Sequence, residues 1–148
     1  SRRTSFPGAR RSVSASPGSL PKGICHCDFH FSNVLFEGDE LIALLDFDDA
    51  NYTYLTFDLV GLIEHWAWPH TADKLDLGAA RDVVQTYMRH RALREQERYH
   101  LYDLYKLSIL MDCVWYFSRW SAGSFYEKRK LEWLERLGRQ RFCTGLFG

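Results

Sequence analysis

The sequence of 148 residues lacks any apolar run near the 18 residues that a membrane-spanning helix needs, so no membrane partner is expected. It also lacks net charge and a clustered basic patch, which argues against a nucleic-acid partner. Its four cysteines offer no second ligand pair to complete a zinc site with His26 or His30. Small buried thiols in a reducing, cytoplasmic setting are the simpler interpretation.

The charges are unevenly distributed along the chain. Residues 1–23 carry five basic side chains and no acid, whereas residues 24–73 carry ten acids and no Lys or Arg. Such an acidic stretch suits a cation site, although a solvated acidic surface has the same composition. Residues 1–22 are rich in Ser, Arg, Pro and Gly, which predicts a disordered basic segment. The alternatives are a transit peptide and a truncated or misjoined N-terminus. Residues 23–148 are then expected to form one domain.

The most informative motif is His26-x-Asp28-x-x-x-x-Asn33, followed by an apolar run that ends in Asp46-Phe47. A phosphoryl-transfer site needs one carboxylate beside the attacking hydroxyl. It also needs an amide and a second carboxylate that hold Mg2+ on the phosphates. Asp28, Asn33 and Asp46 match those types and that order.

Short strands should bring these residues together. The pattern predicts a strand over 24–28, a second over 33–36 and a third over 41–47, with the last two joined by a tight turn at Gly38-Asp39. Such a hairpin would place Asn33 and Asp46 side by side at its open end, and Asp28 in the loop that leads into it. An Asp at the end of a buried apolar strand is costly unless it is paired or bound to metal.

The remainder of the chain is helical in pattern, which makes the fold class α+β. Helices are predicted over 57–68, 76–90 and 95–120, followed by a fourth that begins at a capping box, Ser124 to Glu127, and ends near Gly138. The aromatic residues of the helices are expected to be mostly core, with one or two lining a substrate pocket.

The segments 23–36, 45–50 and 54–59 resemble the aminoglycoside phosphotransferase superfamily, and most of all its type II homoserine kinase branch. The resemblance covers roughly residues 20–148. It implies that Asp28 is the catalytic base, that Asn33 and Asp46 bind Mg2+, and that His26 and Asp58 support the catalytic loop. The implied reaction transfers phosphate from ATP to a hydroxyl of a small alcohol, such as homoserine or an aminoglycoside. Asp48, Asp49 and His30 are candidates for secondary metal or substrate contacts.

Two departures from the family pattern stand out. Position 27 is Cys, where the family usually has Gly or Ala. Residues 1–22 contain neither a Gly-rich strand–loop–strand pattern nor the Lys and Glu of a kinase N-terminal lobe. The chain is therefore expected to be a protein-kinase-like C-terminal lobe, a small hairpin plus about four helices, with the N-terminal lobe absent.

Three other interpretations remain open from the sequence. The chain can be an inactive, detached kinase C-terminal lobe or a binding module. A haloacid-dehalogenase-type phosphatase is a third alternative, because Asp46-x-Asp48 follows an apolar strand, but the downstream residues show no repeated strand–helix units for its parallel sheet. The acceptor and the oligomeric state are not readable from the sequence.

Overall fold

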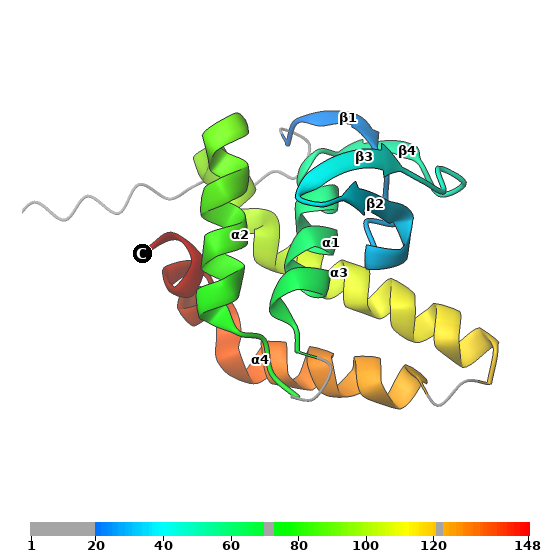
Figure 1. The fold of residues 1–148 in the computed structure, drawn as a ribbon. Helices are drawn as coiled ribbons and strands as arrows, with labels where there is room; N and C mark the ends of the chain where they lie inside the picture. The colour runs from blue at the N-terminus through cyan, green and yellow to red at the C-terminus, as the bar shows by residue number, and fades with distance from the viewer. Residues whose placement is uncertain (1–19, 70–72, 121–122) are drawn as a thin grey trace, which may run out of the picture.

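The computed structural model describes residues 20–69, 73–120 and 123–148 (Figure 1). Within these ranges two small antiparallel sheets precede four helices, an α+β arrangement as expected. The elements in chain order are β1 (Lys22–Cys25), β2 (Val34–Glu37), β3 (Glu40–Leu44), β4 (Asn51–Tyr54), α1 (Thr56–Ala67), α2 (Leu77–His90), α3 (Glu95–Ser118) and α4 (Gly123–Phe147). Residues 1–19 of the expected disordered segment lie outside the described ranges, and β1 already begins at Lys22.

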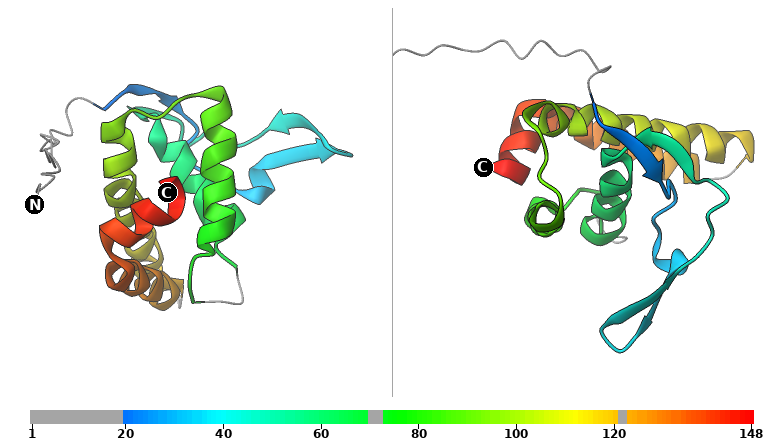
Figure 2. Two further views of the ribbon diagram at one scale, coloured as in Figure 1. Left: turned by 90° about the vertical axis from the view of Figure 1, so that its left-hand side faces the viewer. Right: turned by 90° about the horizontal axis from the view of Figure 1, so that it is seen from above.

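Strands β2 and β3 form the expected hairpin, which projects from the helical body (Figure 2). Gly38, with φ of 60°, occupies the left-handed conformation that its turn requires. The prediction of a buried strand reaching Phe47 is wrong: β3 ends at Leu44, and Leu41 and Ile42 are 52% and 55% exposed. The reason is that a two-stranded hairpin standing away from the helices leaves its apolar side chains uncovered.

The other sheet pairs β1 with β4, from Lys22 opposite Tyr54 to Cys25 opposite Asn51. Strand β4 was not predicted, because Asn-Tyr-Thr-Tyr after an acidic loop carries no clear apolar alternation. The strand expected over 24–28 ends at Cys25. Cys27 lies beyond the strand with a φ of 65°, so Cys25 and Cys27 do not share one strand face.

The first three helices lie close to their predicted ranges. Asp76 caps α2 by accepting the backbone N–H groups of Gly78 and Ala79, as an Asp at that position should. The expected end of the last helix at Gly138 is only a break, with φ of 74°, because helical structure resumes and continues to Phe147. The Ser124 side chain of the predicted capping box lies outside what the structure describes.

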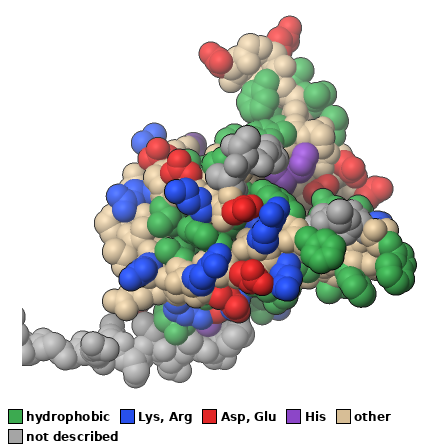
Figure 3. All heavy atoms as spheres, turned by 90° about the horizontal axis from the view of Figure 1, so that it is seen from below, with side chains coloured by type: hydrophobic (Ala, Val, Ile, Leu, Met, Phe, Trp, Pro, Cys, Tyr) green, Lys and Arg blue, Asp and Glu red, His purple; other side chains and the backbone are tan. Residues whose placement is uncertain are grey.

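The core lies among the four helices, where α3 packs along α4 and α1 packs against α2 and α3. It is built from apolar residues of all four, including Ile63, Val84, Tyr105 and Phe142. Several aromatic residues expected in the core are instead exposed, Trp120 by 93%. In Figure 3, basic and acidic side chains intermingle over one face, and hydrophobic side chains gather at the edge where α3 ends and α4 begins.

Two classes of architecture find no support in these ranges. None of the described helices is both long enough and apolar enough to cross a membrane. The strands described are all antiparallel and paired in twos, so the parallel sheet of a haloacid-dehalogenase-type phosphatase is not found among them.

Candidate functional site

The loop that follows β1 is fixed from beneath by the first turn of α1. Asp58 accepts the backbone N–H of His26 through one carboxylate oxygen and that of Cys27 through the other, both at 2.9 Å. Asp58 is partly buried, and the N-terminal end of a helix favours its negative charge. This is the contact expected for a residue that braces the loop leading to Asp28.

His26 is buried and connects this loop to the base of the hairpin. Its Nδ1 accepts the backbone N–H of Asp28 at 3.3 Å, which assigns the ring proton to Nε2. Nε2 then donates to the backbone carbonyl of Leu45 at 2.7 Å. The ring also contacts the Phe47 ring edge-on, with centroids 4.7 Å apart. Both ring nitrogens of His26 are thus engaged by the backbone.

Asp28 and Asn33 are in direct contact. The Asn33 side-chain amide donates to the Asp28 carboxylate at 2.8 Å and to the Asp28 backbone carbonyl at 3.0 Å. Asn33 is buried, and its amide oxygen accepts a hydrogen bond from the Ser32 hydroxyl at 3.3 Å. The chain thus turns back over the five residues from Asp28 to Asn33, so that the two side chains lie against each other.

Asp46 lies next to this pair in the fold. The backbone N–H of Leu45 donates to the carbonyl of Asn33 at 2.8 Å, which brings the residue before Asp46 against Asn33. Asp46 itself is exposed and has a φ of 59°, a left-handed conformation that Asp tolerates better than most residues.

Three candidate residues remain: Asp48, Asp49 and His30. Asp48 and Asp49 are exposed on the loop before β4. His30 contacts the Ser32 hydroxyl through Nδ1 at 2.9 Å, and its ring lies against that of His65 with centroids 4.3 Å apart. His30 lines the cavity described next, whereas Asp48 and Asp49 do not.

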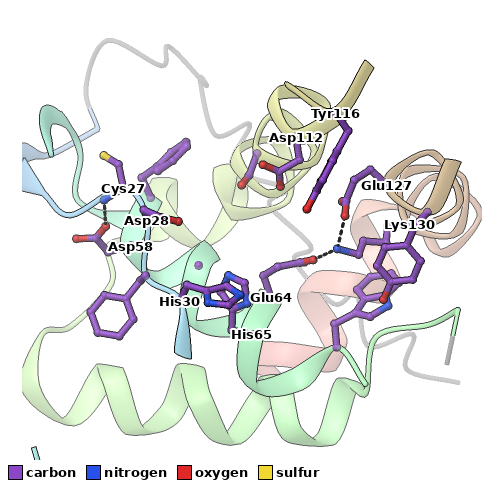
Figure 4. Close-up of a pocket in the computed structure, with 16 residues that line it drawn as sticks. Cys27, Asp28, His30, Asp58, Glu64, His65, Asp112, Tyr116, Glu127 and Lys130 are labelled. Atoms are coloured by element: carbon purple, nitrogen blue, oxygen red, sulfur yellow. Dashed lines mark hydrogen bonds and ion pairs between the residues drawn. The ribbon is translucent and has the colours of Figure 1, made fainter. Parts of the chain in front are cut away.

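A cavity of about 320 Å³ opens beside Asp28. Helices α1, α3 and α4 supply most of its wall, and the loop after β1 supplies the remainder (Figure 4). Acidic and aromatic side chains dominate the wall, among them Glu64, Trp68, Asp112, Tyr116, Tyr126 and Glu127.

A buried ion-pair cluster forms part of the wall of the cavity. Lys130 on α4 pairs with Glu64 on α1 and, at 2.9 Å, with Glu127 one turn earlier on its own helix. Glu64 also accepts a hydrogen bond from the buried hydroxyl of Tyr105. Burial lowers the pKa of Lys130, but the two carboxylates outweigh it and raise the pKa overall. Lys130 therefore stays charged at neutral pH.

The other titratable groups of the cavity are shifted by burial. Burial, aided by the charges of Glu127 and Glu64, raises the pKa of Asp112 to about 7. Burial also raises the pKa of Glu127, an effect that Lys130 offsets in part. Burial and the neighbouring His30 lower the pKa of His65 to about 4, so His65 is neutral near pH 7.

The acidic wall of this cavity was not predicted from the sequence. Glu64, Asp112 and Glu127 lie on three helices, so no local spacing joins them. Each of these acids nevertheless has sequence neighbours that could have indicated a buried or paired carboxylate. Glu64 follows Val-Gly-Leu-Ile on an apolar helix, Asp112 sits between Met111 and Cys113, and Glu127 stands one turn before Lys130.

The described residues of the site offer oxygen ligands of the kind that Mg2+ prefers, but they do not by themselves surround a metal ion. The described residues include no group of three or more His, Cys, Asp or Glu side chains arranged to hold a metal. Mg2+ commonly takes only one or two protein carboxylates and completes its shell with phosphates and water. The Asn33 amide oxygen and the exposed Asp46 carboxylate fit that limited role.

Comparisons with known proteins show which family the chain resembles. The model of the phosphotransferase enzyme family matches residues 9–102. The chain is 32% identical to the homoserine kinase of Nitrobacter winogradskyi over 135 residues, which is 88% of this chain and 41% of the relative. It is 30% identical to the homoserine kinase of Cupriavidus taiwanensis over 83% of this chain and 37% of that protein. The chain thus spans about two fifths of the length of these curated relatives.

Proposed function

This chain belongs to the phosphotransferase enzyme family, and we propose that it forms the acceptor-side lobe of an ATP-dependent kinase that phosphorylates a hydroxyl of a small alcohol. The observation that supports this most is the contact between Asp28 and Asn33 at the mouth of the cavity. A base and a metal-binding amide must lie side by side where the acceptor meets the phosphates.

In this proposal Asp28 orients the acceptor hydroxyl and takes its proton as the oxygen attacks the γ-phosphorus of ATP. Asn33 and Asp46 would hold Mg2+, which when bound supplies positive charge to the phosphate oxygens. His26 and Asp58 keep the loop in place through their backbone hydrogen bonds. Asp48 and Asp49, exposed beside Asp46, remain secondary candidates for metal contacts.

The domain 23–148 would act as a protein-kinase-like C-terminal lobe. The exposed apolar side chains of the β2–β3 hairpin, including Leu35, Leu41 and Ile42, suit a surface that a nucleotide base and a preceding lobe would cover. Such a lobe would supply the phosphate-covering loop and the Lys that kinases use. Activity is therefore proposed for the chain together with that lobe.

The acceptor would occupy the cavity beside Asp28. A volume of about 320 Å³ fits a small alcohol or one ring of a larger one. The relatives are named homoserine kinases, which makes homoserine the first acceptor to examine, and an aminoglycoside is the second.

The experiment is a screen of small alcohols for ADP release, with the chain joined to the preceding lobe of a homoserine kinase relative. Wild-type protein should release ADP faster with its acceptor than without it, and the Asp28→Asn variant should not. If no alcohol in the screen stimulates ADP release above the level of that variant, the chain is an inactive lobe or a binding module, and the proposal is wrong.

A further inference from the structure

The side of α3 that points away from the core changes character midway along the helix. In its first half, Asp103 and Lys106 pair with Arg139 and Glu135 of α4. In its second half the same side is apolar and uncovered, with side chains that are 43% to 71% exposed. The residues of this α3 stripe are Leu107, Leu110, Met111, Val114 and Phe117.

The spacing of the α3 stripe is that of a helix packed against another helix. Leu107, Leu110, Val114 and Phe117 follow one another at intervals of three, four and three residues, the alternation of apolar positions in a coiled coil. Met111 widens the stripe by one position. A helix that meets water on this side would carry polar side chains there. The spacing therefore favours a second helix as the neighbour of the stripe.

Aromatic side chains extend the stripe around the end of α3. Trp115, Trp120 and Phe125 are 50%, 93% and 72% exposed. Trp120 stacks on Phe117 of the stripe, with ring centroids 6.3 Å apart. Hydrophobic side chains gather along this edge in Figure 3. A large contiguous apolar patch on a protein surface marks an interaction site.

The apolar area at this edge matches what a dimer contact needs. An aromatic side chain offers about 150–250 Å² for burial, so the exposed rings of Trp115, Phe117, Trp120 and Phe125 together contribute on the order of 500 Å². The aliphatic side chains of the stripe bring the total near the roughly 800 Å² that each partner of a standard interface buries. A partner of the size of this chain is therefore a suitable occupant.

The absence of charge in the stripe favours a second copy as that partner. Between Leu107 and Ser118 the only charged residue is Asp112, which lines the cavity on the opposite side of the helix. A two-fold contact sets a surface against its own copy, so any charge near the axis would face the same charge. A helix that lies on a membrane surface instead carries Lys and Arg beside its apolar side, and this stretch has neither.

We infer that the chain forms a two-fold symmetric dimer in which the α3 stripe packs antiparallel against the stripe of a second copy. A two-fold axis perpendicular to α3 at the level of Asp112 sets Leu110 opposite Val114 of the second copy. The same axis sets Leu107 opposite Phe117 of the second copy. Both cavities stay open, because Asp112 and its neighbours in the cavity wall lie on the other side of each helix. The inference does not depend on the proposed function.

Sedimentation equilibrium of the 148-residue chain over a range of concentrations measures the association. We expect a monomer–dimer equilibrium with a Kd of about 1 µM or tighter, a value that interfaces of this area reach. A chain that is still monomeric at about 100 µM, a hundredfold above that Kd, would overturn the inference. If that monomer also floats with phosphatidylcholine vesicles, the stripe is a lipid-binding surface and the inference is equally wrong.

Two charged substitutions test which residues face each other. Leu110→Glu and Val114→Lys should each weaken dimerisation by about 100-fold or more, because each buries unpaired charges in the contact. Both side chains are exposed in the single chain, so the fold should be retained, which circular dichroism checks. Mixed in equal amounts, the two variants should form a heterodimer in which the carboxylate of one chain faces the ammonium of the other. Dimerisation of each variant as in the wild type, or a mixture that stays monomeric, would show that the stripe is not the contact.

Leu41→Glu, on the β2–β3 hairpin, is the matched control. Leu41 is 52% exposed, much as the stripe residues are, but it belongs to a different apolar surface. This variant should dimerise as the wild type does, and loss of its dimer would contradict a contact through α3. The chain joined to a preceding lobe should also be a dimer. A monomeric joined protein would mean that the lobe covers the stripe in place of a second copy, and the inference would fail.

Discussion

The carboxylate of Asp58 accepts the backbone N–H of Cys27 at 2.9 Å, although 31 positions separate the two residues in the chain. The other oxygen of Asp58 accepts the N–H of His26 at the same distance. One side chain at the start of α1 therefore fixes two successive peptide groups, and this determines where the next residue, Asp28, is held relative to the cavity.

Loss of this brace should destabilise the fold. Asp58→Asn puts an amide N–H₂ where a second acceptor is needed, so one backbone donor loses its partner. We expect the free energy of unfolding to fall by about 1–3 kcal/mol, measured by urea denaturation. Asp82→Asn, an exposed acid on α2, is the matched control and should change it by less than about 0.5 kcal/mol. Equal losses in both variants would contradict the role assigned to Asp58.

Cys27 has a φ of 65°, the region in which a side chain is strained and glycine is not. Cys27→Gly should therefore raise the free energy of unfolding by about 0.5–1 kcal/mol, since the relief of strain exceeds the entropic cost of the added glycine. Cys27→Ala keeps the β-carbon and should show no gain. A stability gain in the alanine variant equal to that of glycine would mean that strain is not the cause.

The sequence predicted the parts of the site that are local. The spacing of Asp28 and Asn33 allowed a short loop that returns on itself, and the two side chains are in contact. The helices were predictable from their apolar period and from signals such as Asp76 before α2 and Pro69 after α1.

The parts that depend on distant packing were not predictable. Strand β4 forms only because β1 lies beside it, and the exposure of Leu41 depends on the hairpin standing away from the helices. The meeting of Glu64 with Lys130 depends on how α1 packs relative to α4, which no spacing in the sequence encodes.

Asp46 is expected to contribute to nucleotide binding only when Mg2+ is present. In the protein joined to a preceding lobe, Asp46→Asn should weaken ATP binding in Mg2+ by about tenfold or more, a typical loss when a metal site is weakened. Without Mg2+ the two proteins should bind ATP alike. Asp39→Asn, at the exposed hairpin turn, serves as the control. Equal Mg2+-dependent affinity in the Asp46→Asn variant and the wild type would remove Asp46 from the metal site.

Asp112 should make the charge of the cavity depend on pH. Its pKa of about 7 means that it becomes an anion as pH rises from 6 to 8, while His65, with a pKa of about 4, stays neutral. Lys130 stays charged beside Glu64 and Glu127, and Asp28 and His30 face the same cavity. The carboxyl carbon resonance of Asp112, followed by NMR, should therefore titrate with a midpoint near pH 7.

The same group should also make stability depend on pH. Because the folded pKa of Asp112 lies above the unfolded value, the folded state binds the extra proton between about pH 4 and 7. Stability contributed by this proton is present at low pH and is lost as pH rises through about 7. Asp112→Asn should flatten the dependence of stability on pH, and an unchanged pH dependence in this variant would rule out Asp112 as its source.

The most direct measurement of the central claim is steady-state kinetics of the Asp28→Asn variant in the protein joined to a preceding lobe. Asp28 is proposed to act on the hydroxyl proton in the transition state, so kcat should fall by about 10² or more while the affinity for ATP stays nearly constant. The amide keeps the size of the side chain and its contact position beside Asn33. Turnover close to that of the wild type would contradict the account.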